Sequence, residues 1–428
     1  MRFQRLNPGS PLRRTRLGFQ LSLAAAAAVV WGSPPLWTQY HLVRARSELK
    51  NRDVDRALAH LRHAGLFDAE NAERRFLLAR AARRQGQMEA MHAHLERAAR
   101  LGYDREALRR EEVLLRAQAG LLSQAEPHLS SLLRDPRGDA PEICEVFVDA
   151  YFAAYRFENA FTLLDGWEAD FPKDPQPHVF RGLYHEHGGR AAEAAASYRR
   201  ALELAPQRVD VRERLARQLM TLHEYDAAAE AFRICLARRP DNPDVRAGWA
   251  ACLEAMGRTG EARRVFEDVL ASHPDHYDAR LALARLDHAS EHASQALARL
   301  AALCRERPTN TEARYLLARC LHAEGQIEAA KPHFQFAAEA RLRMAEVPRL
   351  QQQVRSNPND VELRYRIGAT LIEYDVPEHG AAWLHSVLQI DPHHRPTHAA
   401  LARYYASIGQ EDAAERHRRL TADPEKDP

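Results

Sequence analysis

Proline recurs at a fixed distance of 34 residues through the middle of this chain. It stands at Pro172, Pro206, Pro240, Pro274 and Pro308. Alanine keeps the same period from Ala160 to Ala330. A fixed period of about 20 to 50 residues indicates stacked supersecondary units, because each unit buries its apolar face only against its neighbours. The chain is therefore expected to fold as a repeat array.

The composition of each repeat favours a pair of helices. Only 19 of the 428 residues are glycine, and 45% are apolar. An acid or amide occupies the second position of each regular unit, where it favours the helix dipole, and proline ends the second helix. The units are predicted to start at Pro141, Pro175, Val209, Pro243, Tyr277 and Thr311, and two final units at Val361 and Arg395. A small residue at position eight and a large one at position 24 are expected to interlock.

The unit beginning at Val209 carries the most specific pattern. Its positions seven, eight, 11, 20, 24 and 32 are Leu215, Ala216, Leu219, Ala228, Phe232 and Pro240. This pattern resembles the tetratricopeptide repeat, over about residues 38–423 in ten or eleven units. The resemblance implies an all-α, right-handed superhelical solenoid of antiparallel helix pairs. It also implies a concave groove, lined by the first helices, that binds proteins or extended peptides without chemistry of its own.

Three departures from the pattern affect the expected shape. Leu342 stands where proline was due, and the 34-residue step resumes at Pro358. An irregular unit with an extra or elongated helix is therefore expected near residues 343–356, kinked or divided at Pro348. Asp287 and Gly380 also replace the apolar residue and the alanine that the family pattern expects.

The N-terminus has the composition of a membrane anchor. Residues 1–16 carry five arginines and no acid, and residues 17–37 carry no charge. As a helix, 21 residues span about 30 Å, enough to cross a bilayer. The expectation is one transmembrane helix, with the N-terminus cytoplasmic and the repeats on the outer (periplasmic or extracytoplasmic) side. The alternative is a signal peptide, cleaved after Gly32, and a secreted protein. Residues 424–428 form a polar tail.

If the family geometry holds, positions five, nine and twelve of the first helices face the groove. The candidate peptide-binding residues are Glu145, Asp149, Arg217, Arg285, Tyr315, Arg319, Tyr365 and Arg403, and earlier units add Phe76, Arg80 and Arg83. Guanidinium groups pair with carboxylates, and tyrosine offers a large contact area at low entropic cost. An acidic or extended peptide is therefore the expected ligand.

Motifs for catalysis, metals and nucleic acid do not occur in this sequence. It contains no HExxH, GxxxxGK[ST] or GxSxG, and its net charge is only +2. Two histidine pairs with four-residue spacing straddle predicted helix boundaries. We therefore expect no catalytic residue, cofactor or metal, and no nucleic-acid partner. The leading hypothesis is a membrane-anchored scaffold that binds a protein or peptide. The alternative is an exported accessory subunit of an envelope enzyme or of a polysaccharide synthesis or export complex.

Overall fold

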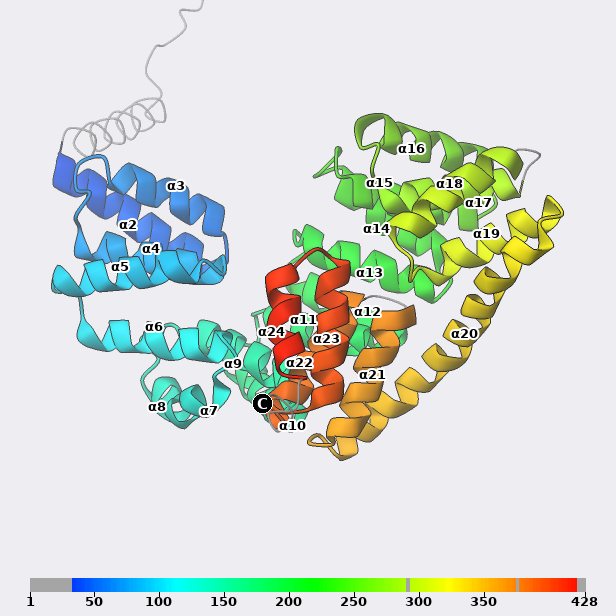
Figure 1. Cartoon of the computed structure of the whole chain (residues 1–428). Coiled ribbons are helices and arrows are strands. Elements are labelled where there is room, and N and C mark those ends of the chain that lie inside the picture. Colours follow the sequence, from blue (N-terminus) through cyan, green and yellow to red (C-terminus); the bar gives the residue numbers. More distant parts are fainter. Residues whose placement is uncertain (1–32, 290–292, 375–376, 422–428) are drawn as a thin grey trace, which may run out of the picture. The chain divides into compact units, whose positions relative to one another are not determined.

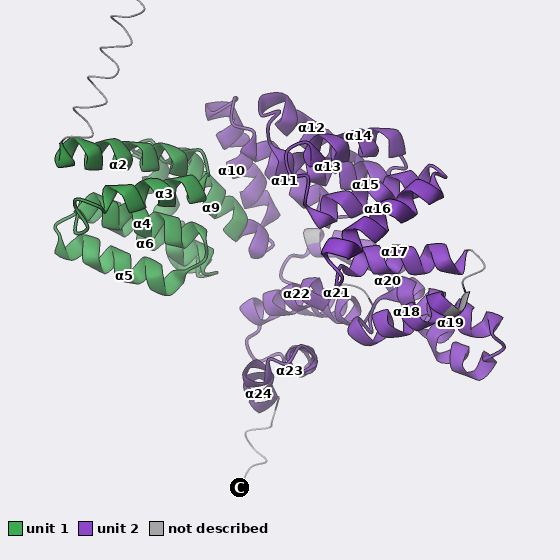
Figure 2. Cartoon of the chain, turned by 90° about the horizontal axis from the view of Figure 1, so that it is seen from above, with its two compact units in different colours: residues 1–150 green, residues 151–428 purple. Residues whose placement is uncertain are grey.

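The computed structural model describes residues 33–289, 293–374 and 377–421, and within these ranges it contains helices and no strand (Figure 1). The chain divides into two compact units, residues 1–150 and 151–428 (Figure 2). The first unit contains α2 (Pro34–Lys50), α3 (Val54–Ala64), α4 (Ala72–Arg84), α5 (Met88–Arg100), α6 (Arg105–Gln118), α7 (Leu122–Ala125), the 3₁₀ helix η1 (Glu126–His128) and α8 (Leu129–Arg134). Helix α9 (Ala140–Ala153) extends from the first unit into the second.

The second unit continues the helix pairs to the C-terminal end of the described chain. It contains α10 (Phe157–Asp170), α11 (Gln176–His187), α12 (Ala191–Leu204), α13 (Val209–Thr221), α14 (Tyr225–Leu236), α15 (Pro243–Ala255), α16 (Thr259–Ser272), α17 (Tyr277–His288), α18 (Ala293–Glu306), α19 (Thr311–Ala323), α20 (Ile327–Ser356), α21 (Val361–Tyr374), α22 (Pro377–Ile390), α23 (Arg395–Ser407) and α24 (Glu411–Arg419). From α13 onwards, each first helix begins at the residue where the sequence pattern starts a unit.

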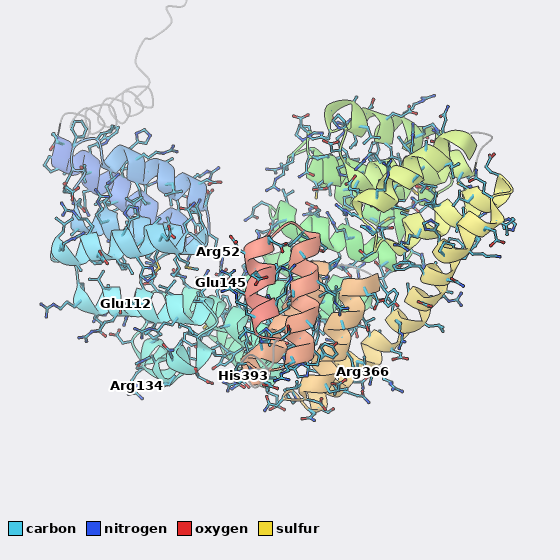
Figure 3. The ribbon with its side chains drawn as sticks, viewed as in Figure 1. Arg52, Glu112, Arg134, Glu145, Arg366 and His393 are labelled. Carbon is cyan, nitrogen blue, oxygen red and sulfur yellow. The ribbon has the colours of Figure 1, made fainter. Side chains whose placement is uncertain are left out.

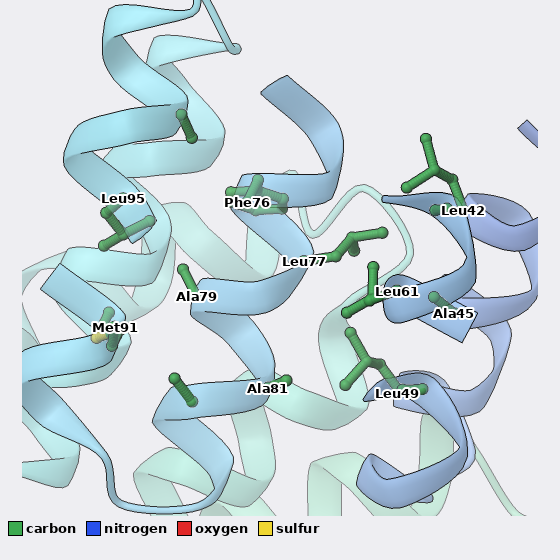
Figure 4. Close-up of a cluster of buried hydrophobic side chains, with 14 of the residues drawn as sticks. Leu42, Ala45, Leu49, Leu61, Phe76, Leu77, Ala79, Ala81, Met91 and Leu95 are labelled. Carbon is green, nitrogen blue, oxygen red and sulfur yellow. The ribbon is translucent and has the colours of Figure 1, made fainter. Parts of the chain in front are cut away.

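The small and large positions of the repeat interlock in the core. In the unit beginning at Val209, Ala216 and Ala228 are fully buried, and Phe232 fills the space between the helices. In the preceding unit, Gly182 takes the place of alanine, because a Cβ there would lie 2.3 Å from the ring of Tyr198. In each repeat, therefore, a small residue on the first helix makes room for a large side chain from the second helix, as close packing requires. The compact unit of residues 1–150 has a core of the same kind, with Leu42, Leu61, Phe76, Met91 and other apolar residues (Figure 4).

Arginine at position four supports the loop between repeats. Arg212 donates to the carbonyl of Pro206 at 2.7 Å, Arg314 to Pro308 at 2.5 Å and Arg364 to Pro358 at 2.7 Å. In the last unit, His398 makes the equivalent contact with Pro392 at 2.9 Å. In each case the donor lies six residues after the proline. The side chain thereby satisfies the carbonyl of a loop residue, two positions past the end of the preceding helix.

Asp287 departs from the family pattern without disrupting the core. The side chain is only 2% exposed. It pairs with Arg263 of α16 at 2.7 Å and with Arg299 of α18 at 2.9 Å. A buried carboxylate is tolerated when it is paired, and this one joins the second helices on either side of α17.

Helix α20 runs through the break in the proline ladder as one helix of 30 residues, with Pro332 and Pro348 inside it. The sequence pattern predicts an extra or elongated helix near residues 343–356. In Figure 1 the long helix leads from α19 to α21. After the C-terminal end of α20, helices α21 and α22 pack against the turn before α10. Trp383 lies 4.3 Å from the ring of Tyr155, and the buried Arg364 lies 4.2 Å from it. The second unit thus brings its last repeats back to its first.

Gly380 also has a structural reason. A Cβ at Gly380 would lie 2.6 Å from the carbonyl oxygen of Gly368 on α21 and 2.6 Å from the backbone nitrogen of Ile372. Gly368 is at position eight of the same unit, and Gly380 is at position 20. Glycine at both positions lets the two backbones approach more closely than the alanines of other units allow.

Most of the predicted anchor, residues 17–32, lies outside the described residues. The prediction is wrong for the end of the anchor, because Pro34 to Trp37 form the first turn of α2, which belongs to the first repeat. The Trp37 indole donates to the carbonyl of His63 at 3.0 Å, and its ring lies 6.3 Å from that of Phe67. Among the helices of the described ranges, none has the length and apolar character needed to cross a bilayer.

Candidate functional site

Position nine of the first helix carries arginine in four repeats of the second unit, in three different environments. Arg217 is exposed and pairs with Glu213 of its own helix at 2.7 Å. Arg285 pairs with Glu254 of α15 at 2.7 Å and with Glu312 of α19 at 2.5 Å. Arg319 and Arg403 are exposed and have no ion-pair partner in the described part of the chain.

Arg285 therefore acts as a link between three first helices. Its hydrogen bond to Glu254 and the charges of Glu254 and Glu312 raise the pKa of the guanidinium further above its usual value. A ligand carboxylate would have to compete with two side chains that already hold this group. Arg285 was predicted to bind a ligand directly. Its two ion pairs instead favour a structural role, in which it joins neighbouring repeats.

Arg319 lies among exposed side chains on α19. Tyr315 is one turn before it and 45% exposed, and His322 is exposed one turn after it. We call Tyr315, Arg319 and His322 the α19 face. The rings of Tyr315 and His322 both approach Phe334 of α20, at 6.0 Å and 6.4 Å. The aromatic contacts hold two side chains of the face in place, and the guanidinium between them remains available.

A cysteine and a histidine beside this face approach each other without being activated. Sγ of Cys320 lies 3.3 Å from Nδ1 of His288. Burial raises the pKa of the Cys320 thiol. Burial, and then the positive charge of Arg319, lowers the pKa of His288. Both shifts favour neutral groups, whereas nucleophilic catalysis by cysteine requires a thiolate, so this pair is not prepared for such chemistry.

The other C-terminal candidates are separate from the α19 face in sequence and surroundings. Tyr365 is half-buried, with its ring 5.3 Å from that of His394. Arg403 borders a depression of about 400 Å³ between α23 and the end of α24. Alanines at positions 399, 402 and 406 line it, together with Arg418 and Thr421. Arg418 pairs with Glu411 at 2.6 Å, so Arg403 supplies the unpaired charge there.

The acidic candidates belong to the first unit of the chain. Glu145 pairs with Arg52 at 2.7 Å, and Figure 3 labels the two residues one above the other. Asp149, one helical turn further along α9, is exposed. The charge of Glu145 is thus already partly compensated within the protein.

Arg80 and Arg83 do not face a groove, contrary to the expectation from the sequence. They are 4% and 1% exposed. Arg80 pairs with Glu111 and Asp139 at 3.2 Å each, and Arg83 pairs with Glu111 at 2.7 Å. Both also contact Glu142. Burial alone would raise the pKa of Glu142, but the charges of Arg80 and Arg83 hold it well below its usual value. These residues join α4, α6 and α9 as a buried ion cluster.

Two histidine pairs in the structure were not predicted from the sequence pattern. Nδ1 of His41 lies 2.8 Å from Nδ1 of His60, and Nδ1 of His398 lies 2.8 Å from Nδ1 of His417. Both pairs have a spacing of 19 residues, so one histidine lies on each helix of a repeat. The first pair belongs to the repeat of α2 and α3, and the second to the repeat of α23 and α24. The shared spacing of 19 residues is visible in the sequence and could have predicted both pairs. No group of three or more histidine, cysteine or acidic residues in the described ranges is arranged to hold a metal ion.

Comparison with known proteins supports the repeat assignment. Family models described as tetratricopeptide repeat match residues 146–209, 219–286, 253–305 and 288–335. No curated protein matches the chain. Among solved structures, a thermophilic TPR protein of Thermus thermophilus is 20% identical, over 46% of this chain and 99% of that one, with a TM-score of 0.35. A tetratricopeptide repeat protein from Parabacteroides merdae is 12% identical, over 59% and 95%, with a TM-score of 0.32.

Proposed function

We propose that this protein is a non-catalytic scaffold that binds an acidic, extended peptide segment of a partner protein on the α19 face. The tetratricopeptide repeats support a role in protein interaction. The observation that carries the finer proposal is Arg319, an exposed arginine without an ion-pair partner in the described residues, set between Tyr315 and His322.

The position-nine arginines explain why the α19 face is favoured over the rest of the array. Arg217 and Arg285 are equivalent to Arg319 in the repeat, but acids of the protein already hold both of them. A guanidinium without a carboxylate partner gains more from an incoming one, because planar bidentate pairing then replaces hydration alone. An exposed tyrosine beside it adds apolar contact area at low entropic cost.

We also propose that the uncharged segment that begins at residue 17 anchors this scaffold in a membrane, with the repeats on the outer (periplasmic or extracytoplasmic) side. The support is sequence chemistry: five arginines precede an uncharged, alanine-rich and leucine-containing stretch. Positive residues remain on the cytoplasmic side of a membrane-spanning segment. Alkaline extraction of native membranes tests the anchor: an integral protein stays in the pellet, whereas release into the supernatant contradicts the proposal.

Peptide binding is tested by screening a random peptide library against the full-length protein. Enriched sequences should contain Asp or Glu and an aromatic or aliphatic neighbour, and their affinity should fall with salt. Arg319→Ala should weaken binding of the enriched peptides by about tenfold or more, as loss of a charge-assisted hydrogen bond predicts.

Arg217→Ala is the matched control, because it removes an exposed arginine from the same repeat position. We expect it to leave the affinity for the same peptides unchanged. If both variants bind equally well, the α19 face is not the site. If the library yields no acidic preference, the ligand chemistry is wrong even where a peptide binds.

A further inference from the structure

The first repeat exposes a concentration of large apolar side chains. On α2, Leu36, Tyr40 and Val43 are 47%, 49% and 50% exposed, and their spacing of four and three residues places them on one side of the helix. We call these three residues the α2 stripe. The opposite side of α2 holds Leu42, Ala45 and Leu49 in the core. The helix is therefore apolar on two sides, although only one of them packs against the protein.

The turn after α3 extends this surface. Leu66 and Phe67 are 67% and 55% exposed, and the ring of Phe67 lies 6.3 Å from that of Trp37, within α2. Elsewhere in the described ranges, large exposed apolar residues occur singly along the chain. Single exposed residues are normal, whereas a contiguous group indicates an interaction surface.

We propose that the α2 stripe, with Leu66 and Phe67, rests on the surface of a phospholipid bilayer. This inference rests on the membrane anchor proposed above. The stripe begins four residues after residue 32, the last of the anchor residues that lie outside the described chain. A bilayer that holds residues 17–32 therefore lies within reach of Leu36 without any intervening domain.

The backbone at the start of α2 allows this arrangement. Ser33 has extended backbone angles, with φ −121° and ψ 103°, and two prolines occupy the first helical positions. Helix α2 therefore begins at Pro34. Its axis can lie along the membrane surface whatever the direction of the segment before it.

The competing occupant is the apolar segment itself, folded back over α2. Residues 17–31 contain only Gln20 and Ser22 as hydrogen-bonding side chains, apart from the indole of Trp31, and no charge. A helix of that composition is apolar all round, so covering the stripe with one side would leave its other side in water. A bilayer covers both surfaces at once.

The side chains at this edge fit the interfacial region of a membrane. Tyr40 and Trp37 are amphipathic aromatic residues of the kind enriched at headgroup level. Arg62 is exposed, lies one turn before Leu66 and has no ion-pair partner in the described residues, so it can meet an anionic headgroup. Apolar insertion combined with positive charge is the usual basis of interfacial binding.

The test uses the full-length protein in vesicles of phosphatidylcholine and phosphatidylglycerol. An environment-sensitive fluorophore is attached at Val43→Cys, in a background with Cys304→Ser, because the other cysteines are buried. The probe should emit at shorter wavelength and be quenched several-fold by lipids with brominated chains. A probe at Ala93→Cys, exposed on α5 of the same unit, is the control and should not be quenched.

Adding Tyr40→Glu to the Val43→Cys protein should largely abolish the quenching while the protein still floats with the vesicles. If the Val43 probe is no more quenched than the Ala93 probe in floating protein, the anchor stands and the docking surface is wrong. If emission is shifted without quenching by brominated lipid, protein covers the stripe, and the bilayer proposal is overturned. If the chain does not float with vesicles, the anchor fails and the docking proposal fails with it.

Discussion

Replacing Gly380 by alanine should destabilise the second unit, although alanine is the better helix former. Gly380 lies inside α22, where a Cβ would come within 2.6 Å of Gly368 O and of Ile372 N. Ordinary contact begins at 3.4 Å, so the helices must separate by about 0.8 Å at this point. Cγ1 of Ile372 lies equally close and could move aside, but the other two obstructing atoms belong to the backbone of α21 and cannot move by changing a rotamer.

The magnitude follows from two opposing effects. Alanine is favoured over glycine by about 1 kcal/mol in a helix interior. Overpacking a close contact costs about 1 to 3 kcal/mol, and rigid backbone atoms favour the upper end. The expected net loss is therefore about 2 kcal/mol. Gly166→Ala is the matched control, because Gly166 is exposed within α10 and nothing lies within 4 Å of its added Cβ. It should stabilise by about 1 kcal/mol.

Urea unfolding followed by circular dichroism compares the two variants with the parent protein. Hydrogen exchange should show that Gly380→Ala weakens protection mainly in α21 and α22 and in the turn at Tyr155, which these two helices contact. Equal stabilisation by both alanines would refute the close approach of α21 and α22. Equal loss in both would show that glycine is required for another reason.

The buried ion cluster and the first histidine pair give two further predictions. Glu142→Gln leaves Arg80 and Arg83 with too little negative charge in a buried site, so the first unit should lose about 3 to 5 kcal/mol in urea unfolding; a loss below about 1 kcal/mol would contradict this. Because the folded pKa of Glu142 is lowered, its contribution is complete above the unfolded pKa and disappears as pH falls through the folded value. The pKa of His41 is lowered to about 4 by burial and by His60 and His63. Stability of α2 and α3 should therefore be complete above about pH 6.5 and decline towards pH 4, as measured by hydrogen exchange corrected for intrinsic rate. His60→Gln should reduce that decline, and an unchanged pH profile would show that the pair does not titrate with folding.

Some side-chain roles were readable from the repeat and others were not. Ala228 and Phe232 could be assigned to the core, because their positions recur in every unit and small or large residues there have one use. Arg80 and Arg319 could not be told apart in this way, since both were assigned to groove positions. Arg80 pairs with Glu111 of α6 and Glu142 of α9, whereas Arg319 has no acidic partner in the described residues. The difference lies in the neighbouring helices, which a single-unit pattern does not contain.

Arginine at position four illustrates the same limit. The sequence shows Arg212, Arg314 and Arg364 at equivalent positions, but only the structure shows each one donating to a proline carbonyl six residues earlier. The abundance of arginine in this chain thus has a partly structural cause. Arginines that serve loops and core ion pairs must be set aside before any of them is assigned to a ligand.

The sequence by itself determined the helix pairs, their boundaries and the interlocking core positions. These features depend on contacts within one repeat or with the next, and a 34-residue period records such contacts directly. Only the tertiary structure decided that α20 continues through the missing proline and that Trp383 and Arg364 return to Tyr155. That contact joins residues more than 200 positions apart, and it depends on the summed rotation of all the repeats between them. No local pattern encodes such a sum.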